Sequence, residues 1–401
     1  GGGKGLWPLA PSPNQHTLNM KIAVLRQRVG ALGGAEATLG YLVRGLAAAG
    51  HEVVVYAADA GPEAGLPLGP GVKSVPVPVW GGKAGRLLSY ALNSRRLLKQ
   101  AGVQMVFSLE RTLFQQVYRA GDGCHREWLE RWTPFLSPAA RLGQQFSLFH
   151  RVMLGLEARL FAAPGLLRVI ANSRQVQEEI IRHYQVAPDK IRIIFNGLDH
   201  ERFQPGPAGS GTITGSQSGA PPGAKIILFV GSGFIRKGLA YLIEAFSCLT
   251  DQESLLWVVG KGSVRRYQQL AARFGVAGRV KFWGPQTEVA PFYQAAAVLA
   301  LPTIYDPCSN VVLEALGCGC PVVTTAGNGA KEFITPGVNG AILAQPHDIP
   351  ALAQALQEFA AAGRDPQVRQ KAQEAVAHLS WDQTTSQTLT VLEEAAAGGG
   401  R

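Results

Sequence analysis

The sequence predicts an α/β protein with two domains, each built on a parallel β-sheet. Three observations lead to this fold class. A chain of 401 residues is typical of about two domains. Short apolar runs alternate with helical runs in both halves of the chain, which is typical of βαβ units. A stretch rich in Gly, Ser and Pro, residues 205–223, separates the two halves.

The first half opens on a strand, a glycine turn, a helix and a second strand. These elements are expected at residues 22–25, 30–36, up to about 49 and 51–56, with a further strand at 103–107. Gly50 is the expected end of the helix, because glycine adopts backbone conformations that other residues avoid.

The second half repeats this order of elements. We expect a strand at 226–230, a glycine turn at 231–238, a helix at 239–249, strands at 255–260 and 280–283, and a last helix from 381 to about 397. Ligands of parallel sheets bind beyond the carboxyl ends of the strands, so the two glycine turns are the expected ligand positions.

Composition divides the chain into five segments. Residues 1–19 lack a continuous apolar run and are expected to be a non-native or disordered leader, because a strand-like start follows at Met20. The linker 205–223 has no capacity for a core. The remaining segments are an N-terminal domain at 20–204, a C-terminal domain at 224–380, and a helix at 381–401 that is expected to cross back to the N-terminal domain.

The charge balance restricts the partners. The formal net charge of +10 suits nucleic acid, an anionic membrane surface or an acidic substrate. No long Lys/Arg run and no interleaved basic–aromatic motif typical of nucleic-acid binding occurs, so nucleic acid is not expected as a partner. No apolar stretch approaches the roughly 20 residues that span a bilayer. The five cysteines lack zinc-ligand spacing and are expected to be free thiols in a reducing compartment.

One stretch near the C-terminus, residues 305–325 (YDPCSNVVLEALGCGCPVVTT), places two carboxylates eight positions apart. Asp306 precedes a proline, and Ser309 or Asn310 can cap a helix that carries Glu314 about two turns inside it. The amides of such a helix N-terminus favour an anion such as a phosphate. The alternative is a buried helix with a capping Asp and one stray Glu. The run that follows, residues 322–325, is expected to be a short buried strand.

A second candidate site follows the first strand of the C-terminal half. Gly231 and Gly233 give a flexible turn, and Arg236 and Lys237 add two adjacent cations. A strand end with glycines and cations is a good diphosphate site, because Arg makes bidentate contacts and Lys offers a compact charge. The alternative is a solvated basic turn. No Gly-Lys-Ser/Thr sequence follows, so the turn is not a Walker loop.

Two candidates lie in the N-terminal half. Gly33 and Gly34 open the first helix and would let a backbone come close to a phosphate, although a tight turn without a ligand explains them equally. Asp122 follows the strand-like residues 117–120 and could accept a hydrogen bond from a sugar hydroxyl, and His125 could be a general base. A structural role in a turn is the alternative for both.

These motifs, in this order, resemble a family-4 retaining glycosyltransferase of the GT-B fold. That fold has two Rossmann-like domains facing each other across a cleft. The resemblance covers nearly all of residues 20–397. The stretches VYRAGDGCHREW, FVGSGFIRKG and LLWVVGKG are most similar to the family members that add glucose to the lipopolysaccharide core.

The resemblance implies roles for the candidate residues. The family carries a Glu-x7-Glu motif, whose first acid contacts the donor sugar and whose second holds the nucleotide ribose. Here Glu314 matches the second acid, and Asp306 replaces the first, which keeps the charge but shortens the side chain by one methylene. Asp122 matches a position near the reacting sugar. The expected catalytic residues are Asp122, Asp306, Arg236 and Lys237, and the expected donor-binding residues are Gly33, Gly34, Gly231, Gly233, Pro285, Ser309, Asn310, Val311 and Glu314.

The resemblance further implies an enzyme that moves a hexose, expected to be glucose, from a UDP-sugar to a lipopolysaccharide-core or similar glycolipid or oligosaccharide acceptor. No Asp-x-Asp sequence occurs, so neither a metal nor another cofactor is expected. The charge and the mixed basic and aromatic runs at 126–132 and 146–151 lead us to expect a cytoplasmic protein held peripherally on the anionic inner membrane. A UDP-sugar 2-epimerase and a non-catalytic nucleotide-sugar-binding scaffold are the alternatives.

Overall fold

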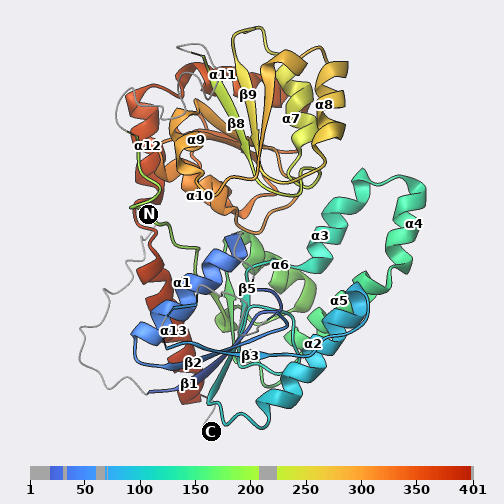
Figure 1. Cartoon of the computed structure of the whole chain (residues 1–401), viewed down its shortest axis with the longest axis vertical. Helices are drawn as coiled ribbons and strands as arrows, with labels where there is room; N and C mark the ends of the chain where they lie inside the picture. Colours follow the sequence, from blue (N-terminus) through green and yellow to red (C-terminus); the bar gives the residue numbers. More distant parts are fainter. Residues whose placement is uncertain (1–18, 30–33, 60–67, 70, 207–223, 399–401) are drawn as a thin grey trace, which may run out of the picture.

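The computed structural model describes residues 19–29, 34–59, 68–69, 71–206 and 224–398. Two α/β domains lie one above the other along the long axis of the molecule (Figure 1). The expected leader at 1–19, except its last residue, and the expected linker at 205–223, except its first two residues, lie outside the described residues.

The N-terminal domain is built on a seven-stranded sheet in the order β3-β2-β1-β4-β5-β6-β7. All neighbouring strands pair in parallel, so all carboxyl ends lie at one edge of the sheet. The strands are β1 (Lys21–Leu25), β2 (Glu52–Ala57), β3 (Lys73–Pro76), β4 (Met105–Ser108), β5 (Val117–Ala120), β6 (Arg168–Ala171) and β7 (Ile191–Ile193).

The helices of this domain are α1 (Gly34–Ala48), α2 (Lys83–Leu98), α3 (His125–Trp132), α4 (Pro138–Phe146), α5 (Leu148–Phe161) and α6 (Arg174–Tyr184). Helices α3 and α4 form an arm that extends away from the sheet, at the right of Figure 1, and α5 returns to pack beside α2. Ser137 and Ser147 are the N-cap residues of α4 and α5, and each side chain accepts a hydrogen bond from an amide in the first turn.

The C-terminal domain is built on a six-stranded parallel sheet in the order β10-β9-β8-β11-β12-β13. Its strands are β8 (Ile226–Val230), β9 (Leu255–Val259), β10 (Val280–Gly284), β11 (Val298–Leu301), β12 (Val322–Thr325) and β13 (Gly340–Leu343). Its helices are α7 (Leu239–Ser247), α8 (Val264–Arg273), α9 (Ala290–Ala295), α10 (Asn310–Gly317), α11 (Ile349–Ala362) and α12 (Pro366–Val376). The apolar side chains of β8, β9, β11 and β12 are buried in one large core.

The last helix, α13 (Trp381–Gly398), runs back along the N-terminal domain and packs against α1 (Figure 1). The rings of Tyr41 and Trp381 stack with their centroids 4.5 Å apart. Thr384 donates a hydrogen bond to the carbonyl of Phe195, which joins the start of α13 to the segment between the domains. The chain therefore crosses between the two domains twice.

The strands and helices lie close to the positions expected from the sequence, with ends that shift by one or two residues. One expectation was wrong. Glu314 lies about one turn inside its helix, because α10 begins at Asn310 and a turn takes about 3.6 residues. Among the described residues, no helix is long and apolar enough to cross a membrane.

Candidate active site

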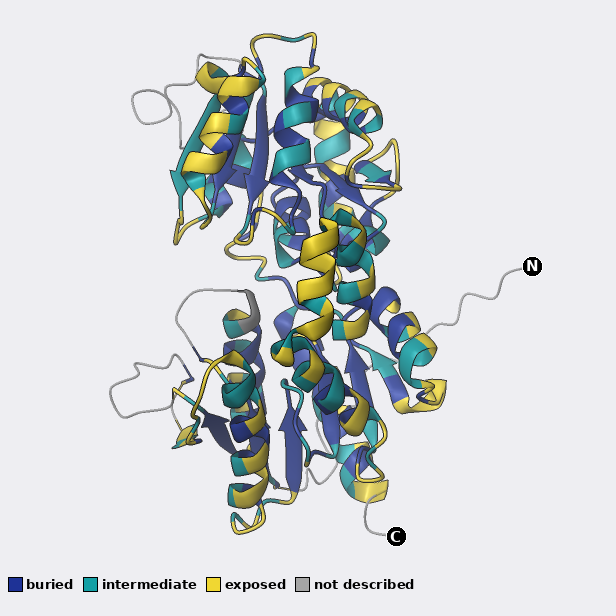
Figure 2. Cartoon of the chain, turned by 90° about the vertical axis from the view of Figure 1, so that its right-hand side faces the viewer, coloured by how far each residue is buried: buried dark blue, intermediate teal, exposed yellow. Residues whose placement is uncertain are grey.

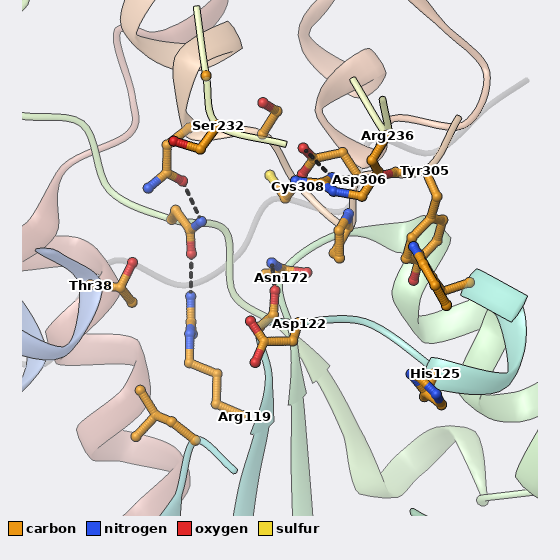
Figure 3. A pocket seen from close by; sticks show the side chains of 18 of the residues that line it. Thr38, Arg119, Asp122, His125, Asn172, Ser232, Arg236, Tyr305, Asp306 and Cys308 are labelled. Atoms are coloured by element: carbon orange, nitrogen blue, oxygen red, sulfur yellow. Dashed lines mark hydrogen bonds and ion pairs between the residues drawn. The ribbon is translucent and has the colours of Figure 1, made fainter. Parts of the chain in front are cut away.

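A cavity of about 750 Å³ lies between the two domains and takes its walls from both. Figure 3 shows side chains of the two domains converging on it, with Asp122 on the N-terminal side and Asp306 on the C-terminal side. The C-terminal domain supplies the turn after β8 and the loop before α10. The N-terminal domain supplies the loop after β5, the start of α3 and part of α5. The turn after β8, the loop before α10 and the loop after β5 follow the carboxyl ends of parallel strands, where ligands of such sheets bind.

The turn after β8 depends on two glycines. Gly231 has φ 142° and Gly238 has φ 78°, both in the region that favours glycine. A β-carbon at Gly231 would lie 2.6 Å from Cδ of Lys237, and one at Gly238 would collide with the carbonyl of Pro302. The turn can therefore close only with glycine at these positions, and it brings Lys237 across the end of the strand.

Asp306 forms ion pairs with both cations of this turn. Its Oδ2 lies 3.1 Å from Nη1 of Arg236 and 3.3 Å from Nζ of Lys237. Burial alone would raise the pKa of Asp306, but the two cations outweigh it and hold the pKa below its usual value. Burial lowers the pKa of Lys237, and the charge of Asp306 opposes that effect. Asp306 is therefore an ionised carboxylate at neutral pH.

The loop after Asp306 leads into α10, whose N-terminus faces the cavity. Ser309, Asn310 and Val311 line the cavity at this helix end. The amide of Ser309 donates to Oδ1 of Asn328 at 3.3 Å. The N-terminus of a helix carries a partial positive charge, so it adds to Arg236 and Lys237 in attracting an anion.

Glu314 lies one turn further along α10. Its Oε2 accepts a hydrogen bond from the hydroxyl of Tyr293 at 2.8 Å. Burial raises the pKa of Glu314, and the hydrogen bond from Tyr293 lowers it in part. One carboxylate oxygen is thus held by α9, and the carboxylate keeps further acceptor capacity.

The N-terminal wall carries a second charged group. Asp122 lies 3.3 Å from Nη1 of Arg26, and Nε of Arg26 lies 3.5 Å from Glu110. Next to them, Arg119 donates to Oδ1 of Asn196 at 2.8 Å, and Asn196 donates to Oδ1 of Asn310 at 2.6 Å. Figure 3 shows the first of these links rising from Arg119 toward the other domain. A chain of hydrogen bonds therefore joins β5 to the N-terminus of α10.

Two histidines form the far end of the N-terminal wall. Nε2 of His125 lies 3.0 Å from Nδ1 of His150, and the ring of Trp128 stacks on His125 with centroids 5.5 Å apart. Burial and the charge of Arg111 lower the pKa of His125 to about 4, and burial lowers the pKa of His150. Both imidazoles are therefore neutral near neutral pH, in an aromatic wall completed by Phe149.

The comparisons with known protein families agree with this architecture. Residues 32–202 match the family described as Glycosyltransferase Family 4, and residues 224–362 match Glycosyl transferases group 1. The chain belongs to the GT-B glycosyltransferases. The two matches cover most of both domains, and the family and fold expected from the sequence are thereby confirmed.

Two relatives of this glycosyltransferase are named for different transfer reactions. The lipopolysaccharide glucosyltransferase WaaG of Escherichia coli (strain K12) is 27% identical over 78% of this chain and 82% of that protein. A D-inositol 3-phosphate glycosyltransferase of Streptomyces bingchenggensis is 31% identical over 58% of this chain and 53% of that protein. The chain thus spans about half the length of this second relative.

Solved structures share the fold of the glycosyltransferase. A crystal structure of WaaG, described as involved in lipopolysaccharide biosynthesis, superposes with a TM-score of 0.78 at 23% identity, covering 92% of this chain and 99% of that one. Anabaena Alr3699/HepE in complex with UDP-glucose superposes with a TM-score of 0.69 at 20% identity, covering 94% of this chain and all of that one. At these sequence identities the similarity to the two structures shows a shared fold.

The structure brings most of the expected site residues to one cavity. Its walls include Asp122, Gly231, Arg236, Lys237, Asp306, Ser309, Asn310 and Val311. Within the described part of the chain, Gly233, Pro285 and Glu314 are not among the cavity-lining residues. Pro285 is exposed just after the edge strand β10, and Gly34 begins α1. Gly33 lies outside the described residues.

Several residues of the glycosyltransferase cavity were not identified from the sequence. Arg26, Arg119, Asn196, His150 and Tyr305 come from separate segments, and only the fold brings them together. The sequence gives no local pattern for Arg26, which follows β1, or for Arg119, which lies within the buried strand β5. Asn196 precedes Gly197 in a turn-like sequence, and an amide at the junction of two domains is a sign of a polar contact.

Proposed function

We propose that the protein transfers a hexosyl group, glucose in the first instance, from a UDP-sugar to a hydroxyl of a lipopolysaccharide-core or similar glycolipid acceptor, with retention of configuration. The observation that carries this proposal is the position of Asp306 between two cations, beside a helix N-terminus. The names of two similar proteins support it, since one is a lipopolysaccharide glucosyltransferase and the other binds UDP-glucose.

The C-terminal wall of the cavity would hold the donor. Arg236, Lys237 and the N-terminus of α10 at Asn310 and Val311 provide the positive charge that the diphosphate of a UDP-sugar needs. Glu314 would accept hydrogen bonds from the ribose hydroxyls. The diphosphate would then share Arg236 and Lys237 with Asp306, which would leave the Asp306 carboxylate next to the sugar.

The reaction breaks the bond between C1 of the sugar and the oxygen of the β-phosphate. The bond from the acceptor oxygen to C1 forms on the same face, and the acceptor proton passes to the leaving phosphate. Charge that develops on UDP is stabilised by Arg236, Lys237 and the N-terminus of α10. The side chains of this chain supply that stabilisation and hold both substrates, while the cleft between the domains excludes water.

The N-terminal wall would hold the acceptor. Whichever histidine carries the shared proton, His125 and His150 together offer one N–H donor and one nitrogen acceptor on their outer atoms. A sugar hydroxyl donates and accepts hydrogen bonds, so it suits such a pair. Trp128 and Phe149 add apolar faces for the carbohydrate ring, and Asp122 accepts a hydrogen bond from a hydroxyl.

We further propose that the protein attaches reversibly to the cytoplasmic face of an anionic inner membrane. The docking face consists of exposed apolar residues before and on α2 and at the α4–α5 junction: Trp80, Leu88, Leu92, Leu142, Phe146 and Leu148. Exposed cations accompany them, namely Lys83, Arg95, Arg96, Lys99, Arg141 and Arg151. Figure 2 shows this side of the molecule, where the helices facing the viewer carry many exposed residues.

The decisive experiment follows UDP release when the protein is mixed with UDP-glucose, with or without a heptose-containing lipopolysaccharide core. Release that requires the acceptor supports the transferase. Interconversion of the UDP-sugar without acceptor would indicate an epimerase, and tight binding without turnover would indicate a scaffold. A panel of UDP-, ADP- and GDP-sugars, compared by thermal stabilisation, identifies the donor, since a ligand that binds only the folded protein raises its stability.

A further inference from the structure

Tyr305 joins three segments through one hydroxyl group. It belongs to the C-terminal domain and directly precedes Asp306 in the sequence, and 2% of its surface is exposed. Its hydroxyl donates to Oε2 of Glu179 at 2.6 Å, on α6 of the N-terminal domain. The same oxygen accepts a hydrogen bond from the amide of Cys124 at 3.2 Å, two residues after Asp122. The loops of the two cavity carboxylates therefore meet at this hydroxyl.

The backbone around this contact leaves room for Tyr305. Gly123 has φ 66°, and a β-carbon there would collide with the Tyr305 hydroxyl. The loop that carries Asp122 can thus approach the other domain only because residue 123 is glycine. Tyr305 and Pro307 both contact this position, so the fit is specific to the two facing loops.

The N-terminus of α6 strengthens the same contact. Ser173 donates to the carbonyl of Pro307 at 2.7 Å, and Arg174 lies 3.1 Å from Glu332. These bonds join the N-terminus of α6 to the residue after Asp306 and to the 3-10 helix Gly329–Phe333, so the first turn of α6 is a surface on which the C-terminal domain rests. Figure 3 shows Tyr305 and Asp306 side by side above the Asp122 loop.

We propose that the hydrogen bond between Tyr305 and Glu179 closes the two domains in the arrangement that sets Asp306 opposite Asp122, so that Tyr305 and Glu179 are positioning residues for the transfer. Neither needs to touch the substrate. Their role rests on the proposed transferase function, but their effect on the domain arrangement can be measured without any substrate.

The charges around Glu179 give this contact a pH dependence. Burial raises the pKa of Glu179 to about 7, and the Tyr305 hydroxyl opposes part of that effect. Glu127 and Arg131 of α3, Arg182 of α6 itself, and the thiol of Cys124 are the other titratable or charged groups that face it.

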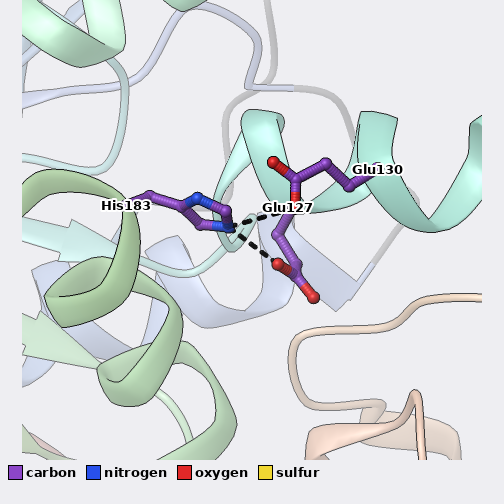
Figure 4. A group of neighbouring side chains, drawn as sticks. All are labelled: Glu127, Glu130 and His183. Carbon is purple, nitrogen blue, oxygen red and sulfur yellow. Dashed lines mark hydrogen bonds and ion pairs between the residues drawn. The ribbon is translucent and has the colours of Figure 1, made fainter.

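The cations near Glu179 are already engaged with a different carboxylate. Glu127 pairs with Arg131, Arg182 and His183, as Figure 4 shows for the histidine. Glu127, Glu130 and His183 lie close enough together to suggest a metal site, but the two arginines already neutralise Glu127. Within the described residues, Oε1 of Glu179 has no hydrogen-bond partner, so Glu179 is a buried acid without its own cation.

The sign of the pH effect follows from linkage. Opening the cleft returns Glu179 to water, where its pKa falls toward the ordinary value near 4.5. The closed form therefore binds a proton that the open form releases. Closure is fully favoured below that ordinary pKa and is progressively lost as the pH rises through the pKa of the closed form.

Small-angle X-ray scattering of the unliganded protein tests this at about pH 6 and about pH 8. We expect the radius of gyration of the wild type to increase with pH. Glu179→Gln should stay compact at both values, because the amide oxygen still accepts from Tyr305 and no longer titrates. Tyr305→Phe should be expanded at both. Tyr90→Phe, which removes a buried hydroxyl inside the N-terminal domain, is the matched control and should follow the wild type.

Kinetics provide a second readout. With UDP-glucose as donor, Tyr305→Phe should lower kcat about five- to tenfold, the size expected for one hydrogen bond, and leave the donor KM nearly unchanged. Equal scattering of Tyr305→Phe and wild type at about pH 6, or a pH response that Glu179→Gln retains, would overturn the proposal. If Tyr305→Phe does not fold, the pH response of Glu179→Gln decides alone. Absence of turnover in the wild type would count against the transferase function and leave the scattering result intact.

Discussion

Oδ2 of Asp306 accepts hydrogen bonds from both Arg236 and Lys237, at 3.1 and 3.3 Å. The same arginine also donates to the carbonyl of Tyr305 at 2.7 Å. A Glu at this position would reach about one methylene further into the cavity, whereas the Asp carboxylate stays beside the cations of the β8 turn. The two cations thus serve both the carboxylate and the proposed diphosphate, and their loss should be felt first in nucleotide binding.

We predict that Lys237→Ala and Arg236→Ala weaken the binding of UDP. Each removes a charge-assisted hydrogen bond of about 1.5–3 kcal/mol, or roughly a 10- to 150-fold loss of affinity. The larger effect is expected for Lys237, because its side chain is 9% exposed against 35% for Arg236. Isothermal calorimetry with UDP measures the change. Lys73→Ala, which breaks an exposed pair with Glu52, is the control, and unchanged affinity in both site variants would remove this turn from the donor site.

Substitution of Glu314 on α10 and substitution of Asp306 in the loop before it should affect different steps, the first UDP binding and the second turnover. We predict that Glu314→Gln lowers UDP affinity about tenfold, since a neutral amide is a weaker acceptor for ribose hydroxyls. Asp306→Asn should lower kcat about 10- to 100-fold with a smaller change in UDP affinity. Calorimetry and steady-state kinetics on the same preparations compare the variants. Equal loss of UDP affinity in both would contradict the division of roles.

The raised pKa of Glu314 also predicts a pH dependence of UDP binding. Burial favours the protonated form, so the carboxylate becomes protonated closer to neutral pH than an ordinary Glu. The ionised form is the better hydrogen-bond acceptor, so UDP affinity should fall as the pH falls through this raised pKa. Calorimetry across the acid range should show a larger decrease in the wild type than in Glu314→Gln, because the terminal phosphate of UDP also titrates there, with a pKa of about 6. A decrease of equal size in the variant would assign the effect to another group.

The fold was predictable because its signals are local. Residues 226–230 are apolar and end at a glycine, and β8 occupies the same residues. Asp306, Arg236 and Lys237 were found because they stand in short motifs next to strand ends. Arg119 and Tyr305 were not found, since their partners, Asn196 and Glu179, lie 77 and 126 positions away. Contacts of this kind depend on how two domains face each other, which no local pattern encodes.

The histidine pair should determine acceptor binding. We predict that His150→Ala raises the acceptor KM about tenfold and leaves UDP affinity unchanged, because it removes one hydrogen-bonding nitrogen and frees the tautomer of His125. Kinetics with a fixed donor concentration and a varied lipopolysaccharide-core acceptor measure the effect. His347→Ala, at the ring of Phe135 and away from the pair, is the control. A change in UDP affinity as large as the change in acceptor KM would contradict the assignment of the two histidines to the acceptor site.

The docking face predicts salt-sensitive binding to anionic vesicles. Phe146 and Leu148 are 73% and 65% exposed at the α4–α5 junction, on the arm that extends from the N-terminal domain. Residues 126–132 were expected to face the membrane, but Trp128 and Trp132 stack on each other and are half-buried. The apolar contribution therefore comes from Leu142, Phe146 and Leu148. Each Lys or Arg near an anionic surface adds about 1 kcal/mol, which salt screens.

Co-sedimentation with liposomes measures this attachment. The wild type should pellet with anionic vesicles at low salt and be released as salt rises. Phe146→Ser combined with Leu148→Ser should reduce pelleting about tenfold or more, since each loses roughly 1.5–3 kcal/mol of apolar insertion. Val338→Ser, an exposed apolar residue of the C-terminal domain, is the matched control and should pellet as the wild type does. Equal pelleting of the double variant, or none of the wild type, would refute the docking face and leave the transferase proposal standing, because Asp306, Arg236 and Lys237 line the cavity from the C-terminal domain.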